Sequence, residues 1–583
     1  MDKQILNAKK EYQTMKDIDE IKSSKLSKIR LFLFFIFLIL LISLIKWNTP
    51  VLACLIVAVI IIFIFVAIHH NHIENEIKKL TTYLTTISKY EDRGSGTWKT
   101  NTSDQEETEH QFMPDLDIIG KNSLFQFINF TNSLGGKKRL IDKLSLKDFS
   151  KSSINSNQKA IQELKNNFKF SLYFQEKMSK IDKINKTDYK DYLYFFESKP
   201  KNSSKELIVS LIITTITIIV TILTLLGLIH SFYLTGLIIL ELISSYVYIF
   251  LYNEDFEKIS KYTRAYRELK DIYKYIETQE FTSPKLKQIK RNIDKGNIIL
   301  NKLTKIADLD SYRNNFITYV IFNCFASLNF VIHYKYIKLL NDNNEDFETS
   351  IKCLEELESL ISLTTIGYVK ETITLPKITD EISLNMENMK HPLLKEEECI
   401  SNDFNCDKNI NIITGSNMSG KTSFMRTIGI NLILAYTGTY TTADNFSCPI
   451  LKIFTSINVR DDITNGISTF YGELRRIKAV LDYSKKSSEP MIIFIDEIFK
   501  GTNYNDRILG AKETLRKFSA LNCIVFLTTH DFELCEINNK KINNYHFKET
   551  YEKDKIHFDY KIKKGICQTT NAKYLMQQMN IID

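Results

Sequence analysis

The 583-residue chain has no cysteine pattern of the kind that holds a metal or builds a disulfide framework. Its nine cysteines are scattered from Cys54 to Cys567, no two form a C-x-x-C pair, and their number is odd. Disulfide frameworks use paired cysteines, and structural zinc sites use closely spaced ones. The sequence therefore excludes a disulfide-held or zinc-held fold, and it indicates a reducing compartment for the soluble parts.

A strong excess of one charge is also lacking. The formal net charge of +8 is small for this length. It permits contact with nucleic acid or with an anionic membrane surface but demands neither. A chain of this length is expected to form several domains.

Charge is absent from two apolar runs near the N-terminus, Leu31 to Ile45 and Val51 to Ile68, which are separated by a short polar break at 46–50. A signal peptide would have one apolar core and a cleavage site. Two runs with a tight break instead predict a transmembrane hairpin, with a buried hairpin in a soluble core as the alternative.

A second hairpin is predicted from Leu207 to Ile229 and from Phe232 to Tyr252. At ~1.5 Å per residue, each run is long enough for ~30 Å of hydrocarbon. Glu241 is the only charged residue in the returning run. An intramembrane carboxylate is a functional candidate, but a protonated or helix-paired glutamate explains it as well, and we assign Glu241 no role at this stage.

Four spans, an even number, place the N-terminus and the C-terminal half on one side of the membrane. The basic cluster between Lys22 and Arg30 marks that side as cytoplasmic. We therefore expect a multi-pass membrane protein without an extracellular domain.

The remaining segments differ in their periodicity. Residues 91–115 are polar and rich in glycine, serine and threonine, which is typical of a linker, and apolar spacing beyond them is helical until about residue 371. We expect Gly135-Gly136 to interrupt the first of these helices. The predicted fold class is α plus α/β, because strands alternate with helices from residue 372 onward and imply a mainly parallel sheet. The predicted segments are an N-terminal segment (1–30), hairpin 1 (31–69), a linker (70–115), a first helical core segment (116–206), hairpin 2 (207–252), a second helical core and lever segment (253–371) and a C-terminal α/β domain (372–583).

A glycine-rich turn after the apolar run Ile410 to Thr414 fits the P-loop pattern G-x-x-x-x-G-K-[ST]. Its glycines let successive backbone N–H groups face one anion, its lysine reaches phosphates, and its threonine hydroxyl can bind Mg²⁺. A strand before and a helix after the turn, from about Lys421 to Ala435, argue against a chance match. The predicted nucleotide-binding residues are Gly415, Ser416, Asn417, Met418, Ser419, Gly420, Lys421, Thr422 and Ser423.

Two later strands end in polar groups that suit ATP hydrolysis. PMIIFIDE ends in Asp496, which can hold Mg²⁺, and in Glu497, which can act as general base on water. FLTTHD contains His530, placed to hydrogen-bond a γ-phosphate or the attacking water. Ser468 and Thr469 precede another helix as an N-cap whose free N–H groups could meet a phosphate.

Taken together, these motifs resemble the MutS family, the mismatch-recognition ATPases of the ABC-type class. The resemblance covers about Leu116 to Ile582 apart from the second hairpin, and an LSGGQ-type transporter signature is not in the sequence. It is carried by TGSNMSGKTSFMR, AYTGTYTTA, DDITNGISTFYGEL, DEIFKGTN and TTHDFEL.

The resemblance implies ATP and Mg²⁺ as ligands and ATP hydrolysis as the activity. Lys421 would contact phosphates, Thr422 and Asp496 would hold Mg²⁺, Glu497 would polarise water, and His530 would sense the γ-phosphate. It also implies a homodimer in which each P-loop faces Ser468 of the partner subunit, and helical levers that move with nucleotide state.

Three departures from the family matter for function. Only residues 1–115 precede the helical core and a hairpin takes up part of them, so we do not expect mismatch readout; Phe174-Gln175-Glu176 repeats a Phe-x-Glu motif inside the core, where chance explains it. Cys399 stands where an aromatic that stacks on adenine is expected, and Ile400 is left as the apolar contact. The second hairpin stands where the family's DNA clamp would be.

Two functions therefore stay open. The first is a membrane-anchored MutS-like ATPase that binds mismatched or branched DNA, with the basic stretch Pro284 to Lys295 as a contact. A solvated helix face is the alternative for that stretch. The second function is a membrane mechanochemical or signalling ATPase that binds no DNA and acts on an unidentified protein partner.

Overall fold

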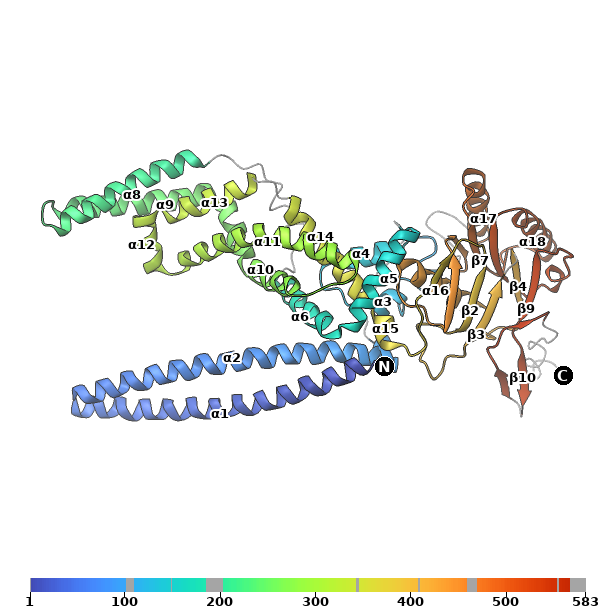
Figure 1. Ribbon diagram of the computed structural model, residues 1–583, viewed down its shortest axis with the longest axis horizontal. Coiled ribbons are helices and arrows are strands. Elements are labelled where there is room, and N and C mark those ends of the chain that lie inside the picture. The colour runs from blue at the N-terminus through green and yellow to red at the C-terminus, as the bar shows by residue number, and fades with distance from the viewer. Residues whose placement is uncertain are drawn as a thin grey trace. The chain divides into compact units, whose positions relative to one another are not determined.

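The structure is a computed structural model that describes residues 2–100, 110–147, 149–184, 203–341, 345–406, 409–458, 469–552 and 555–566. The chain divides into two compact units, each described by itself below (Figure 1). The first contains Met1–Asn129, Leu140–Leu172 and Ile361–Asp583, and the second contains Phe130–Arg139 and Tyr173–Leu360.

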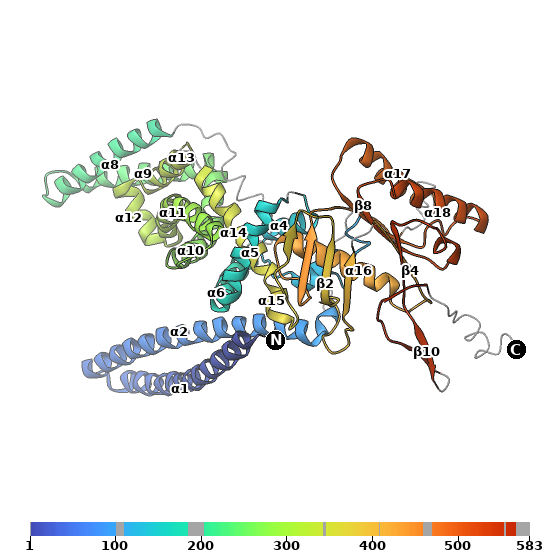
Figure 2. The same ribbon diagram turned by 45° about the vertical axis from the view of Figure 1, so that its right-hand side comes forward.

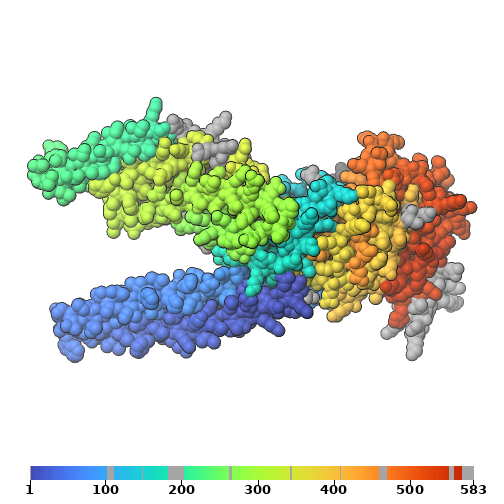
Figure 3. Space-filling model, viewed as in Figure 1, coloured from blue at the N-terminus to red at the C-terminus, as the bar shows by residue number. Residues whose placement is uncertain are grey.

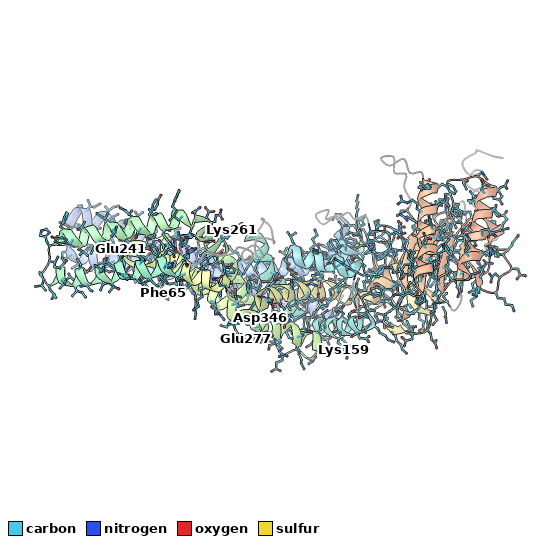
Figure 4. All side chains as sticks on the ribbon, turned by 90° about the horizontal axis from the view of Figure 1, so that it is seen from above. Phe65, Lys159, Glu241, Lys261, Glu277 and Asp346 are labelled. Carbon is cyan, nitrogen blue, oxygen red and sulfur yellow. The ribbon has the colours of Figure 1, made fainter. Side chains whose placement is uncertain are left out.

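The first unit begins with a long antiparallel helical hairpin, drawn in blue in Figure 1 and packed along its length in Figure 3. It consists of α1 (Lys3–Trp47) and α2 (Pro50–Ser95). Asn48 adopts a left-handed conformation with φ of 43°, and Pro50 begins α2, so the turn between the helices is tight. The outer part of the hairpin is apolar and exposed; Phe65, labelled in Figure 4, is 74% exposed.

The predicted linker at 70–115 is wrong for residues 70–95, because α2 continues through them to Ser95. This stretch of α2 is polar in composition, yet it buries an apolar stripe at helical spacing. The stripe consists of Ile73, Leu80, Tyr83, Ile87 and Tyr90. Residues 101–109 of the predicted linker lie outside the described residues.

The base of the hairpin is fixed to the rest of the first unit. Tyr90 packs edge-on against the rings of Phe168 and Tyr368, at centroid distances of 5.5 and 5.7 Å. Arg93 donates hydrogen bonds to backbone carbonyls at the end of α3, including Asn129 O at 3.2 Å. The hairpin therefore extends from the same compact unit that carries the sheets. Helical elements next to this base are η1 (Thr97–Thr100), α3 (Leu124–Ile128), α5 (Lys151–Asn166) and α15 (Thr365–Val369).

The C-terminal region of the first unit holds three sheets (Figure 2). The largest has six strands in the order β12-β9-β4-β8-β7-β6, in which all neighbours are parallel except β12 and β9. A four-stranded sheet has the order β1-β5-β2-β3, and β10 pairs with β11 as an antiparallel hairpin. The strands are β1 (Lys377–Thr379), β2 (Leu384–Met389), β3 (Asn402–Cys406), β4 (Ile410–Thr414), β5 (Asn445–Pro449), β6 (Lys452–Ser456), β7 (Met491–Asp496), β8 (Cys523–Thr528), β9 (Ile542–His546), β10 (Glu549–Glu552), β11 (Lys555–Phe558) and β12 (Lys563–Lys564).

Both faces of the six-stranded sheet are covered, so its central strands are buried throughout. One face packs on α17 (Thr469–Lys486) and α18 (Tyr504–Phe518), through residues such as Ile493, Val525 and Leu515. On the other face Phe404 packs against Phe424 of α16 (Lys421–Thr437) and Phe526 of β8. Burial on both faces explains why these strands appear in the sequence as continuous apolar runs.

The second unit is helical among the residues that the structure describes. Its complete helices are α8 (Ser204–Leu225), α9 (Ser231–Leu251), α10 (Asn253–Glu277), α11 (Pro284–Ser311), η2 (Tyr312–Asn314), α12 (Phe316–Ala326) and α13 (Leu328–Asn341). Three further helices contribute residues to both units: α4 (Leu134–Leu144), α6 (Phe168–Ile184) and α14 (Glu345–Leu363).

Four described helices are long and apolar enough to cross a membrane: α1, α2, α8 and α9, with mean hydropathies of 2.6, 3.6, 2.6 and 2.0 in their most apolar windows. α1 and α2 contain the two predicted segments of the first hairpin, whereas α8 ends at Leu225, four residues before the predicted end at Ile229, and α9 ends at Leu251, one residue before Tyr252. The helices α12 and α13 pass the same test only together, and they are bent by 76° at Ser327. The sequence-based prediction assigned them to the helical core and did not anticipate this apolar bent pair.

The prediction that Gly135-Gly136 interrupts a helix is wrong. The break lies earlier, between the end of α3 at Ile128 and the start of α4 at Leu134, and both glycines lie in the first turn of α4. A Cβ at either position would lie 2.2 Å from a carboxylate oxygen of Glu355 or Glu358. The glycines are therefore needed for this close approach rather than for a break.

Candidate functional site

Three strand ends bring the predicted site residues together at one edge of the six-stranded sheet. The strands β4, β8 and β7 are parallel neighbours, with Ile413 opposite Thr528 and Thr528 opposite Asp496. The turn after β4, the residues after β8 and the carboxylates at the end of β7 therefore lie side by side. This edge is where ligands bind in open parallel sheets.

The turn between β4 and α16 has the backbone of an anion-binding loop. Gly415, Met418 and Gly420 have φ values of 149°, 70° and 106°, in the region that favours glycine. A Cβ on Gly415 would lie 2.8 Å from Ser419 Oγ and 3.1 Å from Phe547 O, so a larger residue does not fit. α16 begins directly after the turn and directs its free N–H groups to it.

Lys421 lies under this turn and is only 5% exposed. Its Nζ donates to Gly415 O at 2.8 Å and to Ser416 O at 2.9 Å. The same atom lies 3.4 Å from His530 Nε2. The ammonium is thus held beneath the loop, where it can meet an anion cradled above it.

Thr422 and Asp496 face one another. Thr422 Oγ1 lies 3.1 and 3.0 Å from the two carboxylate oxygens of Asp496, and Thr528 also donates to this carboxylate. Hydroxyl and carboxylate oxygens are the ligands that Mg²⁺ prefers.

Glu497 and His530 form a second pair. His530 Nε2 lies 3.4 Å from Glu497 Oε1 and 3.0 Å from Asn417 Oδ1, and Lys500 Nζ lies 3.4 Å from Glu497 Oε2. The hydrogen bond from His530, supported by Lys500, lowers the pKa of Glu497 to about 2. Glu497 therefore stays ionised near neutral pH and can accept a hydrogen bond from water.

A cavity of about 550 Å³ opens onto the P-loop and Glu497. Its other walls come from segments far away in the sequence, including Phe547 and Tyr560, which the sequence-based prediction missed. The predicted apolar contact Ile400 lines it and is 45% exposed, whereas Cys399 accepts a hydrogen bond from His391 N at 3.2 Å. The lining residues are Met389, His391, Leu394, Glu398, Cys399, Ile400, Asn402, Ser416, Asn417, Met418, Gly420, Lys421, Thr422, Ser423, Phe424, Thr427, Glu497, Phe547 and Tyr560.

Tyr560 is held over the P-loop by a fixed backbone. Asn402 Nδ2 donates to Tyr560 O at 2.9 Å, and Asn402 Oδ1 accepts from Ile562 N at 2.8 Å. A Cβ on Gly420 would lie 3.2 Å from Tyr560 Cδ1. No motif marks Tyr560, because only the folding of the chain after β11 brings it to the loop.

The segment that carries Ser468 lies outside the described residues, so the structure places only the helix after it. That helix, α17, begins at Thr469, close to the predicted helix start. Glu473 Oε2 accepts from Phe499 N at 2.6 Å, and a Cβ on Gly501 would lie 2.9 Å from Phe470 Cβ. The start of α17 is thus packed directly on the loop after Glu497.

A loop that follows the hairpin reaches the same region. Asp115, which is 1% exposed, accepts from Arg476 Nη1 of α17 at 2.5 Å and from Ile457 N after β6 at 3.0 Å. Arg426 of α16 donates to Asp115 O at 3.0 Å and pairs with Asp117 at 3.0 Å. The loop at 111–118 therefore touches both helices that begin at the site.

The residues present fit a nucleotide and a divalent cation. Ser419 Oγ is buried in the loop and has no hydrogen-bond partner among the described residues. Such an atom in a cradle of N–H groups suits a phosphate oxygen. No cluster of three or more His, Cys, Asp or Glu side chains that could hold a metal occurs among the described residues, so a cation here would depend on Asp496 and Thr422 together with ligand oxygens.

Comparison with known proteins gives the family. Residues 411–579, which contain the P-loop, Asp496, Glu497 and His530, match the model of MutS domain V. This match assigns residues 411–579 to MutS domain V. The chain is similar to the DNA mismatch repair protein MutS of Clostridioides difficile, with 30% identity over 230 residues, and to that of Lactobacillus johnsonii, with 30% identity over 255 residues.

The likeness to these MutS proteins is partial. The aligned regions cover 38% and 42% of this chain, and they span 24% and 29% of the length of the two relatives. The family assignment therefore concerns the ATPase domain, and the activity of the whole protein is argued separately.

Proposed function

We propose that the chain is a membrane-anchored MutS-like ATPase that binds ATP with Mg²⁺ and hydrolyses it. The observation that carries this proposal is a cavity lined by the P-loop and Glu497, with Asp496 in contact with Thr422 and His530 beside Lys421 and Glu497. A structural role alone does not require a buried lysine beneath an anion-binding loop beside a paired carboxylate and histidine.

Each residue then has a defined task. The N–H groups from Gly415 to Ser423 hold the phosphates, and Lys421 neutralises their charge. Thr422 and Asp496 would hold Mg²⁺, and a bound Mg²⁺ would neutralise charge on the phosphate oxygens. Glu497 accepts a proton from the attacking water, and His530 responds to the γ-phosphate through its contacts with Glu497 and Lys421.

The base of the nucleotide is proposed to rest between Ile400 and Tyr560. Both side chains line the cavity and are partly exposed, so their surfaces are accessible to a base. Aromatic rings stack on any base through its π-face. Tyr560 thus supplies the ring that Cys399 lacks.

A homodimer completes the site in this proposal. Ser468 of the partner subunit would approach the γ-phosphate from the N-terminus of α17. Its neighbour Thr469 begins α17, and the N-terminus of a helix favours an anion. The packing of Phe470 and Glu473 on the loop after Glu497 couples the start of α17 to the site in its own subunit.

Insertion in a bilayer is supported by the side chains that the apolar helices expose. On α8 and α9 the exposed residues are large and apolar, such as Ile212 at 56% and Phe250 at 77%, whereas the buried ones are polar. An arrangement with apolar side chains outside and polar ones inside costs free energy in water, whereas a lipid bilayer favours it. We propose four spans, with the N-terminus and the ATPase domain in the cytoplasm.

Two measurements on the full-length protein test these proposals. Titration with a fluorescent ATP analogue should give binding that Lys421→Ala weakens by at least about tenfold, because a P-loop lysine neutralises phosphate charge. The protein should also float with liposomes after alkaline carbonate extraction. Equal nucleotide binding by the variant would contradict the ATP site, and release by carbonate would contradict the anchor.

DNA binding is a second candidate function that one observation favours. α11 exposes three cations, Lys287, Arg291 and Lys295, at four-residue spacing on one face, and none forms an ion pair with a described residue. Such a row suits a phosphate backbone. The relatives are named DNA mismatch repair proteins. A membrane mechanochemical or signalling ATPase that acts on a protein partner is the alternative output.

A further inference from the structure

The second unit contains a polar interior among helices whose outer surfaces are apolar. The buried residues of α8 are Ser210, Thr214 and Thr217, and those of α9 are Glu241, Ser245 and Tyr248. None of these six belongs to the ATP site. Glu241 is labelled in Figure 4, among the helices drawn in green.

Glu241 is the end point of a chain of hydroxyl groups. Thr214 Oγ1 donates to Glu241 Oε1 at 2.9 Å, Ser327 Oγ lies 2.6 Å from Thr214 Oγ1, and Ser210 Oγ donates to Ser327 Oγ at 2.8 Å. Each hydroxyl has one proton to donate. The chain therefore runs from Ser210 through Ser327 and Thr214 and ends on the carboxyl oxygen.

The carboxyl group has no counter-charge among the residues that the structure describes. Glu241 is 1% exposed, and no described residue forms an ion pair with it. A buried carboxylate without a cationic partner is unstable relative to its neutral form, most of all at membrane depth. A bound proton or another monovalent cation must therefore balance it. The Thr214 hydroxyl contacts the carboxyl directly at 2.9 Å, which leaves no gap for a metal ion between these two groups and favours the proton.

A second series of polar contacts joins Asp255, just beyond the C-terminal end of α9, to Tyr248 within α9. Asp255 Oδ2, on a side chain that is 23% exposed, lies 3.0 Å from His333 Nε2, and His333 Nδ1 lies 2.7 Å from Tyr248 OH. An imidazole with a partner on each nitrogen can take up a proton on one side and release one on the other. His333 itself is fully buried.

The bend between α12 and α13 supplies partners for Ser245, which lies between Glu241 and Tyr248 on α9. Ser245, one turn from each of them on α9, donates to Asn323 Oδ1 at 2.9 Å and accepts from Asn329 Nδ2 at 2.6 Å. Asn329 Oδ1 is buried and accepts no hydrogen bond from any described group. A buried acceptor of this kind is a place for a water or another donor.

We propose that Glu241 is an intramembrane proton-binding site, reached from Asp255 through His333 and Tyr248. The titratable group that interacts with it from a packed element is the thiol of Cys324 on α12. Tyr248 on α9 and His333 on α13 contact each other further along the proposed route, and Glu206 at the start of α8 and Asp255 interact with Tyr248. This inference rests on the proposed insertion of α8 and α9 in the bilayer.

Labelling with dicyclohexylcarbodiimide tests the site, because this apolar reagent modifies protonated carboxyl groups in apolar surroundings. Full-length protein in liposomes should carry the label on Glu241 at about pH 7, where exposed carboxylates are ionised. The label should decrease as the pH rises, and Glu241→Gln should remove it. Glu254→Gln, at an exposed carboxylate beyond the end of α9, should leave it unchanged.

Infrared difference spectra provide a readout that does not depend on reagent access. The C=O stretch of a protonated carboxylic acid should be present in the wild-type protein and absent in Glu241→Gln. Absence of this band from the wild-type protein at about pH 7 would overturn the proposal, whatever the labelling result. Protection of Glu241 by Na⁺ but not by choline would also overturn it, in favour of a sodium site.

The route is tested separately from the site. After a pH jump, the wild-type band should change quickly, and His333→Leu should slow the change by ~10-fold or more, as expected when a proton-transfer group is removed. An unchanged rate would contradict the route. Carbonate extraction of the same liposomes distinguishes failure of this site from failure of membrane insertion, since a protein that stays in the membrane without the band refutes only the site.

Discussion

At the scale of single residues, the charge of Glu497 is set by its neighbour His530. The hydrogen bond from His530 lowers the pKa of Glu497 to about 2, so the carboxylate form persists throughout the working range of pH. A lowered carboxyl pKa stabilises the folded protein above about pH 4.5, and this stabilisation is lost as the pH falls toward 2. The same contact keeps Glu497 ready to accept a proton.

Loss of this contact should change the pH dependence of turnover. In His530→Ala the pKa of Glu497 rises toward its ordinary value of ~4.3, so the residual ATPase rate should acquire an acid limb between about pH 4 and 5. His530→Gln, which keeps a donor, should shift the limb less. The measurement is phosphate release from pH 4 to 8, and identical profiles for both variants and the wild-type protein would refute the role of His530.

Tyr560 is the residue that we expect to set affinity for the base. Tyr560→Ala should raise KM for ATP by ~10-fold with little change in kcat, because base stacking on an aromatic ring is worth ~1–3 kcal/mol. Tyr560→Phe keeps the ring and should behave like the wild-type protein. Steady-state kinetics of the three proteins test whether Tyr560 stacks on the base. A KM for ATP in Tyr560→Ala within twofold of the wild-type value would exclude stacking.

At the scale of elements, the loop at 111–118 ties the hairpin to the ATP site. Asp115→Ala removes the partner of Arg476 and leaves two backbone N–H groups without an acceptor. The variant should lower the free energy of unfolding of this unit by ~3 kcal/mol, because breaking a buried ion pair leaves an uncompensated charge. Asp117→Ala is the matched control, since its pair with Arg426 is partly exposed and should cost below ~1 kcal/mol. Thermal unfolding compares the two, and equal midpoints would disprove the special role of Asp115.

The basic row on α11 gives a prediction about DNA. Replacing Lys287, Arg291 and Lys295 with glutamine should reduce the slope of log K against log salt for branched or mismatched DNA by ~3, because each cation that pairs with a phosphate adds ~0.9 to the slope. Lys285→Gln is the control, because Lys285 is paired with Glu356 at 2.5 Å. Fluorescence anisotropy in two or more salt concentrations measures the slope. Absence of any salt-dependent DNA binding by the wild-type protein would favour the alternative function, a membrane ATPase that acts on a protein partner.

Elements with a simple physical signature could be predicted from the sequence. The strands β7 and β8 end within the motifs PMIIFIDE and FLTTHD, as predicted, because both faces are buried and the whole strand is apolar. The length of α2 was missed because its lower half is polar and only its periodicity marks it as a helix. The bend at Ser327 was missed because it depends on hydrogen bonds to other helices, such as that with Ser210.

The candidate site was likewise predictable only where its residues follow one another closely. The P-loop, Asp496 and Glu497 are local motifs at strand ends, and the structure brings them together as their strand positions require. Tyr560 and Asp115 come from segments whose approach depends on sheet order and loop packing. No local pattern in the sequence identifies such residues before the fold is known.

At the scale of the whole molecule, the first hairpin and the ATPase domain share one compact unit. The base of α2 is anchored by Tyr90 and Arg93, and the loop after it contacts α16 and α17. A nucleotide-dependent shift of either helix would therefore reach the hairpin through contacts within this unit. In the proposed arrangement, the energy of ATP hydrolysis is used at the membrane.

Phosphate release by the full-length protein in liposomes tests this account most directly, with wild type and Glu497→Gln compared side by side. The account predicts turnover in the wild-type protein that stops when Mg²⁺ is chelated. In Glu497→Gln, turnover should fall by ~10²-fold or more while nucleotide binding is preserved, because loss of a general base removes proton transfer but not phosphate contacts. Equal phosphate release by both proteins would contradict the ATPase assignment and the mechanism built on it.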